Sequence, residues 1–242
     1  MKIKKILEKI LKIIVYSFLI LSLNISIYKY SQYETDLFQL KHLEVKGNNY
    51  LSDEEIIQAL SLNKTMNIFD CDIKKMKEDI EKITFVKSAT IGLKIPNKIE
   101  IQITERVPIA LIIHNQKKFF IDYERSIIPV ELKSLNNFPV PILNIRRKDL
   151  NNSNSINMIK YLYKNYSTLY NKISEVVEVP SKITLITNLK TKIFLNPKMT
   201  MNNINKLENF EKTIQSINDL NDYKYIDLIH ENQIVVKERV YS

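Results

Sequence analysis

The sequence predicts an α+β protein of three successive parts: a single N-terminal transmembrane helix, a small domain of β-α-α-β-β order, and a mainly antiparallel β domain with two helices. Three observations predict it: an uncharged apolar run between two lysines, a capped and periodic pattern over the next seventy residues, and a strand-rich remainder. The expected boundaries are a short basic cytoplasmic tail at 1–12, a transmembrane helix at 13–30, the small domain at 40–108 and the β domain at 109–242.

The uncharged run extends from Ile13 to Tyr28 and covers about 24 Å as a helix, against about 30 Å of bilayer hydrocarbon. Starting the helix at Ile10 brings the span closer to that thickness, and Lys12 and Lys29 can snorkel toward the headgroups. The lysine excess before the run predicts a single-pass, type II protein of the cytoplasmic (inner) membrane, with its N terminus in the cytoplasm and the rest outside. A cleaved signal peptide is the alternative. The run lacks an Ala-x-Ala pattern, which favours retention.

The formal net charge of +9 does not indicate a nucleic-acid partner. The first twelve residues hold five lysines and one glutamate, a net of +4, which leaves +5 for the other 230 residues. Those charges are scattered among acidic residues, without the basic and aromatic pattern of an RNA-binding sheet. We therefore predict no nucleic-acid binding.

The sequence has few residues that could bind a cofactor or a metal. The only two glycines, Gly47 and Gly92, cannot build a phosphate-cradling loop. Cys71 is the only cysteine, which excludes an intrachain disulfide and a thiolate zinc site and leaves a buried apolar role or a reactive thiol. We predict no cofactor and no metal, because the three histidines share no ligand spacing: His42, His114 and His230.

The small domain begins with a strand that ends in a turn at Gly47. Ser52 and Glu55 form a capping box at the start of the first helix. A second helix is expected to begin at Asp70 or Asp72. Its apolar residues recur at helical spacing: Ile73, Met76, Ile80 and Ile83.

Two strands complete this domain. The first begins at Phe85, and Pro96-Asn97 makes the turn. In the second, Ile99, Ile101 and Ile103 alternate with polar residues, as in a half-buried strand.

These residues resemble the POTRA domain of the FtsQ/DivIB family of bacterial cell-division proteins. The matching segments are Val45-Lys46-Gly47-Asn48, Phe85-Val86 with Ala89 and Ile91, Pro96-Asn97, and Glu105-Arg106-Val107-Pro108-Ile109-Ala110. Leu93 departs from the family, which usually has an arginine there.

The β domain is expected to start with a hairpin around a polar turn at 115–118. Further strands or extended runs are expected at 127–130, 138–143, 173–179, 182–189, 192–195, 223–230 and 234–236. Helical spacing predicts one helix at 156–170 and a second at 204–217. This half resembles the β domain of the same family, through Phe120-Ile121-Asp122, Phe138-Pro139-Val140-Pro141-Ile142-Leu143 and Tyr225-Ile226-Asp227-Leu228.

The resemblance implies a non-enzymatic scaffold of the division-site assembly (the divisome). Such a protein recruits and holds two small bitopic division proteins, FtsB and FtsL, at the septum, together with septal cell-wall synthesis proteins. An edge strand near the C terminus would bind them by strand addition. The residues expected at that edge are Leu228, Ile229, His230, Ile234 and Val236. Leu228, Ile234 and Val236 could instead face the core.

A structural role is expected at the junction between the two domains. Glu105 and Arg106 would bond backbone groups or each other, and Pro108 would set the chain direction.

Two other classes stay open. One is a membrane-anchored extracytoplasmic enzyme with Ser126 or Ser134 as nucleophile, although no Gly-x-Ser-x-Gly, His-Glu-x-x-His or paired-carboxylate pattern accompanies them. The other is the POTRA module of a secretion or outer-membrane assembly system. The 130 or so residues after Ala110 lack the long succession of lipid-facing strands that a barrel needs.

Overall fold

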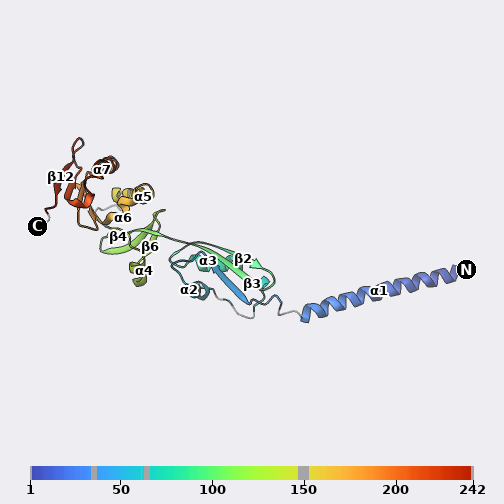
Figure 1. Ribbon diagram of the computed structural model, residues 1–242. Helices are drawn as coiled ribbons and strands as arrows, with labels where there is room; N and C mark the ends of the chain where they lie inside the picture. Colours follow the sequence, from blue (N-terminus) through green and yellow to red (C-terminus); the bar gives the residue numbers. More distant parts are fainter. Residues whose placement is uncertain (1, 34–36, 61, 63–65, 147–152, 241–242) are drawn as a thin grey trace. The chain divides into compact units, whose positions relative to one another are not determined.

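A computed structural model describes residues 2–33, 37–60, 62, 66–146 and 153–240. The chain divides into two compact units, Met1–Glu105 and Arg106–Ser242. The predicted α+β class is confirmed by the order of helices and strands (Figure 1).

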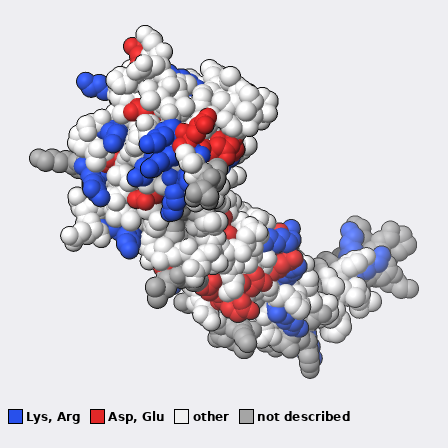
Figure 2. Space-filling model, turned by 60° about the vertical axis from the view of Figure 1, so that its left-hand side comes forward, with Lys and Arg blue, Asp and Glu red and all other residues white. Residues whose placement is uncertain are grey.

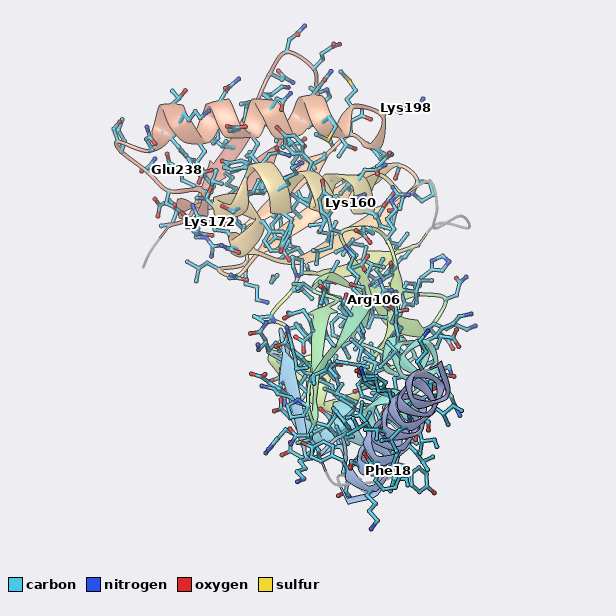
Figure 3. All side chains as sticks on the ribbon, turned by 90° about the vertical axis from the view of Figure 1, so that its right-hand side faces the viewer. Phe18, Arg106, Lys160, Lys172, Lys198 and Glu238 are labelled. Carbon is cyan, nitrogen blue, oxygen red and sulfur yellow. The ribbon has the colours of Figure 1, made fainter. Side chains whose placement is uncertain are left out.

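The N-terminal helix α1 (Lys2–Tyr33) contains a stretch long and apolar enough to cross a membrane, Lys9–Tyr30. It is 22 residues, or about 33 Å at the α-helical rise. Apolar side chains project all around it, as the nearly end-on view around Phe18 shows (Figure 3). A helix that is apolar on every side suits lipid better than a protein surface.

The small domain contains β1 (His42–Lys46), α2 (Asp53–Gln58), a 3-10 turn (Ile68–Asp70), α3 (Ile73–Glu81), β2 (Val86–Lys94) and β3 (Lys98–Glu105). Its sheet has the order β1-β3-β2, with β1 parallel and β2 antiparallel to β3. The Ser52–Glu55 capping box forms with bonds of 3.2 and 3.0 Å, and the side chain of Asp72 caps α3. α3 packs on β2 and α2 contacts β1, and the buried core of the domain includes Ile56, Met76 and Ile80 of the helices and the isoleucines of β3.

The described residues of the β domain form nine strands in one sheet: β4 (Pro108–His114), β5 (Lys117–Asp122), β6 (Ile127–Pro129), β7 (Ile142–Ile145), β8 (Ile173–Val179), β9 (Lys182–Thr187), β10 (Lys192–Leu195), β11 (Tyr223–Asp227) and β12 (Val235–Glu238). Its helices are α4 (Leu132–Asn137), α5 (Asn154–Asn165), α6 (Ser167–Lys172) and α7 (Thr200–Ile214). Two 3-10 turns lie at Pro197–Met199 and Leu220–Asp222.

The strand order in this sheet is β12-β11-β10-β9-β8-β7-β4-β5-β6. Pairing is mainly antiparallel, but β4–β7, β7–β8 and β10–β11 are parallel. The main core contains buried residues of α5, α6 and α7 together with buried residues of the strands, among them Leu143, Val176, Leu185, Ile193 and Ile226.

The structure corrects two helix predictions. The helix expected at 156–170 is two helices, because Tyr166 has a non-helical backbone (φ −142°, ψ 61°). The short helix α4 follows Pro129 in a segment for which no helix was predicted. After this helix, the ring of Phe138 packs edge-on against the ring of Phe120, with 6.0 Å between the ring centroids.

Candidate functional site

The last strand, β12, lies at the end of the strand order (Figure 1). It pairs with β11 on one side, and among the described residues no strand pairs with its other side. All four of its residues are exposed. An open strand edge of this kind presents unpaired N–H and C=O groups, which can pair with another chain.

Hydrogen bonds of neighbouring strands show which main-chain groups of β12 are open. The N–H of Leu228 donates to the carbonyl of Phe194 at 2.9 Å, so the main chain of Leu228 points toward β10. Because main-chain groups alternate sides along a strand, those of Asp227 point toward β12 and those of Ile226 do not. Val236, the register partner of Ile226, therefore turns its N–H and C=O away from β11.

The other end of the strand leads to the same result. The N–H of Arg239 donates to the carbonyl of Asp222 at 2.8 Å. Counting back from Arg239, Lys237 and Val235 point toward β11, and Glu238 points outward with Val236. The open edge of β12 thus consists of the main-chain N–H and C=O groups of Val236 and Glu238.

Two long side chains fix the chain just before and just after β12. Lys206 of α7 donates to the carbonyl of His230 at 2.7 Å and to that of Gln233 at 3.4 Å. The guanidinium of Arg239 donates to the carbonyl of Tyr223 and to the hydroxyl of Thr191. The roles of Lys206 and Arg239 could not be predicted from the sequence, because nothing in the local pattern indicates partners so far along the chain.

The five residues predicted at the edge differ in exposure. Leu228 is fully buried, and its carbonyl accepts from Asn203 at 2.8 Å. Leu228 therefore belongs to the core and not to the candidate surface. Ile229 is half-buried and His230 is exposed in the loop, Ile234 packs partly on the core, and Val236 is 38% exposed.

The two junction residues bond within their own units. The Glu105 carboxylate accepts the N–H groups of Tyr50 at 3.0 Å and Leu51 at 2.8 Å. Arg106 donates to Asp122 at 3.1 Å and to Ser126 at 3.0 Å.

Pro108, the third predicted junction residue, begins β4 and pairs in register with Asp122.

The hydroxyl of Ser134 donates to the carbonyl of Glu131. Cys71 is buried, and burial together with the charge of Asp70 raises the pKa of its thiol. Among the described residues, no group of three His, Cys, Asp or Glu side chains is placed to hold a metal.

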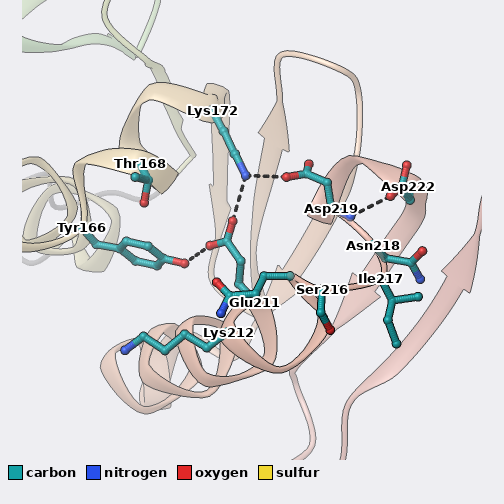
Figure 4. Close-up of a pocket in the computed structure, with 11 residues that line it drawn as sticks. Tyr166, Thr168, Lys172, Glu211, Lys212, Ser216, Ile217, Asn218, Asp219 and Asp222 are labelled. Carbon is teal, nitrogen blue, oxygen red and sulfur yellow. Dashed lines mark hydrogen bonds and ion pairs between the residues drawn. The ribbon is translucent and has the colours of Figure 1, made fainter.

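A cavity of about 570 Å³ lies between α6 and the C-terminal end of α7 (Figure 4). The ammonium of Lys172 lies between the Glu211 and Asp219 carboxylates, 2.8 Å from an oxygen of each, and the Tyr166 hydroxyl donates to Glu211. Burial raises the pKa of Glu211, and the charge of Asp219 raises it further. For Asp219, burial alone would raise the pKa, but hydrogen bonds from Lys172 and Asn221 outweigh it and lower the pKa.

Replacing Lys172 by methionine is expected to destabilise the β domain by about 1–3 kcal/mol at neutral pH, because Glu211 keeps a partly buried charge without its cation. Lys172 also helps to lower the pKa of Asp219, and the stability that this contributes is present above the unfolded value of about 3.8 and is lost as the pH falls. The loss in the variant should therefore shrink as the pH falls, which thermal unfolding followed by circular dichroism at several pH values would measure.

Replacing Lys212 by methionine is the matched control. Its pair with Glu208 is exposed and should contribute little. Equal losses in both variants, or a loss that does not change with pH, would contradict the role of Lys172.

On the face shown in Figure 2, basic and acidic side chains lie next to each other, and uncharged surface surrounds these mixed groups. No single-sign field covers this face, so a partner there would be selected by contacts at short range.

Two family models match successive parts of the chain. The FtsQ-type POTRA domain matches residues 38–106, and the family described as "FtsQ/DivIB, C-terminal related" matches residues 107–237. The chain belongs to the FtsQ/DivIB family of cell-division proteins. The predicted resemblance is thereby confirmed, and the apolar α1 is compatible with the membrane anchoring of a division protein.

Curated relatives carry the same family names. Cell division protein DivIB of Clostridium tetani is 30% identical over 59% of this chain and 55% of its own length. DivIB of Clostridium acetobutylicum is 33% identical over 35% of this chain and 34% of its own length. FtsQ of Rickettsia bellii is 25% identical over 83% of this chain and 73% of its own length. The chain thus spans about half or less of the two clostridial relatives.

Among solved structures, the chain is similar to the major extracytoplasmic domain of the trans isomer of DivIB from Geobacillus stearothermophilus. The two are 14% identical with a TM-score of 0.31, over 47% of this chain and 95% of that one.

Proposed function

We propose that this FtsQ/DivIB protein is a non-enzymatic scaffold that recruits and holds the small bitopic proteins FtsB and FtsL, with septal cell-wall synthesis proteins, at the division septum. The N terminus would lie in the cytoplasm, α1 would cross the membrane once, and both domains would lie outside. The lysine excess before α1 supports this orientation.

The open edge of β12 carries this proposal. Val236 and Glu238 offer main-chain donors and acceptors in strand geometry, so a partner strand can extend the nine-stranded sheet. The loop before β12 adds the exposed His230 and the half-buried Ile229, which supply side-chain contacts that select the partner. Lys206 and Arg239 hold the strand in place before a partner arrives, which lowers the entropy cost of binding.

Co-purification tests the proposal. The full chain, extracted from membranes in mild detergent, is expected to retain FtsB and FtsL, and its depletion should give filamentous or unseparated cells. Replacing Ile229 by glutamate should lower partner recovery about tenfold, because a carboxylate would be desolvated at the interface.

Replacing Ile217 by glutamate is the matched control, because this exposed isoleucine lies in the loop after α7. Partner recovery should stay unchanged. If the Ile229 variant were folded and captured FtsB and FtsL as well as the wild type, the proposed binding edge would be wrong.

A further inference from the structure

Two polar side chains of α1 share one face of the helix. Ser17 and Asn24 are seven residues apart, which brings them within about 20° of each other around an α-helix. All described side chains from Lys9 to Tyr30 are exposed, so this face has no cover from the chain itself. A partner helix could therefore reach both residues.

Both residues would lie deep in the bilayer if α1 spans it. The apolar stretch Lys9–Tyr30 has its centre near residues 19 and 20. At 1.5 Å per residue, Asn24 and Ser17 lie only about 4–7 Å from that centre along the helix axis. Water does not reach this depth, so a polar side chain there must find its hydrogen-bond partners in protein.

Asn24 is left with unused hydrogen-bonding capacity. One of its amide N–H groups donates to the carbonyl of Ile20 at 2.7 Å. An amide side chain has a second N–H and a carbonyl oxygen, and no bond to either is found among the described residues. Ser17 and Ser22 differ, because each hydroxyl already donates to its own helix, to Ile14 and Leu19 respectively.

We propose that α1 pairs in parallel with α1 of a second copy of this chain, through reciprocal hydrogen bonds between the two Asn24 amides. This inference rests on the proposed membrane span. The lysine excess before α1 inserts every copy in the same orientation, so the two Asn24 side chains lie at the same depth. A carboxamide carries both a donor and an acceptor, so two identical amides complement each other. Ser17 lies on the same face, where its small side chain lets the helices approach closely.

Energy transfer between differently labelled copies of the full chain in lipid vesicles tests the proposal, with fluorescent proteins fused at the N terminus. Transfer should fall as the protein is diluted with lipid. Asn24→Leu should raise the apparent dissociation constant about three- to tenfold, the range expected for an interhelical polar contact in a bilayer. Asn24→Gln, which keeps the amide, should largely retain association.

Ser22→Leu is the matched control, because Ser22 lies about 140° around the helix from Ser17 and bonds to its own backbone. It should leave transfer unchanged. Absence of transfer in the wild type, equal transfer in Asn24→Leu, or transfer only when FtsB and FtsL are added would each overturn the proposal.

Alkaline carbonate extraction separates this inference from the proposed function. A wild-type chain that stays in the membrane but does not self-associate overturns only the α1 pairing. A chain released by carbonate overturns both the pairing and the membrane span.

Discussion

Replacing Val236 by proline is expected to abolish capture of FtsB and FtsL while leaving the β domain folded. The N–H of Val236 points away from β11, so its removal costs no bond within the chain. Proline is tolerated in edge strands where the N–H faces solvent. A partner strand would lose a donor and meet the proline ring, and recovery in the co-purification should fall at least about tenfold.

Replacing the adjacent Lys237 by proline gives the matched contrast. Its N–H points toward β11, so the substitution breaks a bond of the ladder and should lower the thermal midpoint of the domain. Circular dichroism of both variants, together with partner recovery, separates loss of binding from loss of folding. Full partner recovery with Val236→Pro would show that the main-chain edge is not the binding surface.

Replacing Gly47 by alanine is expected to destabilise the small domain by about 2–5 kcal/mol, combining the cost of a left-handed residue with that of a steric clash. Gly47 has φ +83°, a conformation that L side chains rarely adopt. A Cβ there would lie 2.2 Å from the carbonyl oxygen of Ile103, a backbone atom that cannot move aside cheaply. Hydrogen exchange of the β1 and β3 amides in the full chain would measure the loss.

Gly92, the only other glycine, is the natural control. A Cβ at Gly92 meets nothing within 4 Å, and its backbone lies in β2. Gly92→Ala should be neutral or slightly stabilising, because alanine lowers the entropy of the unfolded chain. If Gly47→Ala and Gly92→Ala changed the hydrogen-exchange protection of β1 and β3 equally, the close contact between Gly47 and Ile103 would not explain why this turn needs glycine.

Local signals predicted most of the elements. The Ser52–Glu55 capping box and the Asp72 cap form as their sequence patterns indicate, because each is made within three residues. The hairpin predicted from the polar turn at 115–118 forms with a shorter turn, in which Asn115 and Gln116 have positive φ and Lys117 already pairs with His114. Strand ends were less predictable: β11 ends at Asp227, whose side chain accepts the N–H of Ile229 and turns the chain.

Contacts between distant residues could not be read from the same signals. Tyr166 interrupts the predicted helix, and its hydroxyl bonds to Glu211, 45 residues further along the chain. Leu228 was predicted at the partner surface, because an apolar residue near an edge strand looks the same in sequence whether it faces a partner or the core.

The sequence by itself determined the apolar anchor, the two domain types and the position of nearly every strand, because hydrophobic period, caps and turn residues act over a few neighbouring positions. The tertiary structure decided that β12 lies at the end of the sheet and that Val236 and Glu238 turn their main-chain groups outward. It also brought Lys206 to the loop before that strand and placed the Arg239 guanidinium against Tyr223 and Thr191. These features depend on how strands far apart in the chain are ordered and paired, and local preferences do not specify that order.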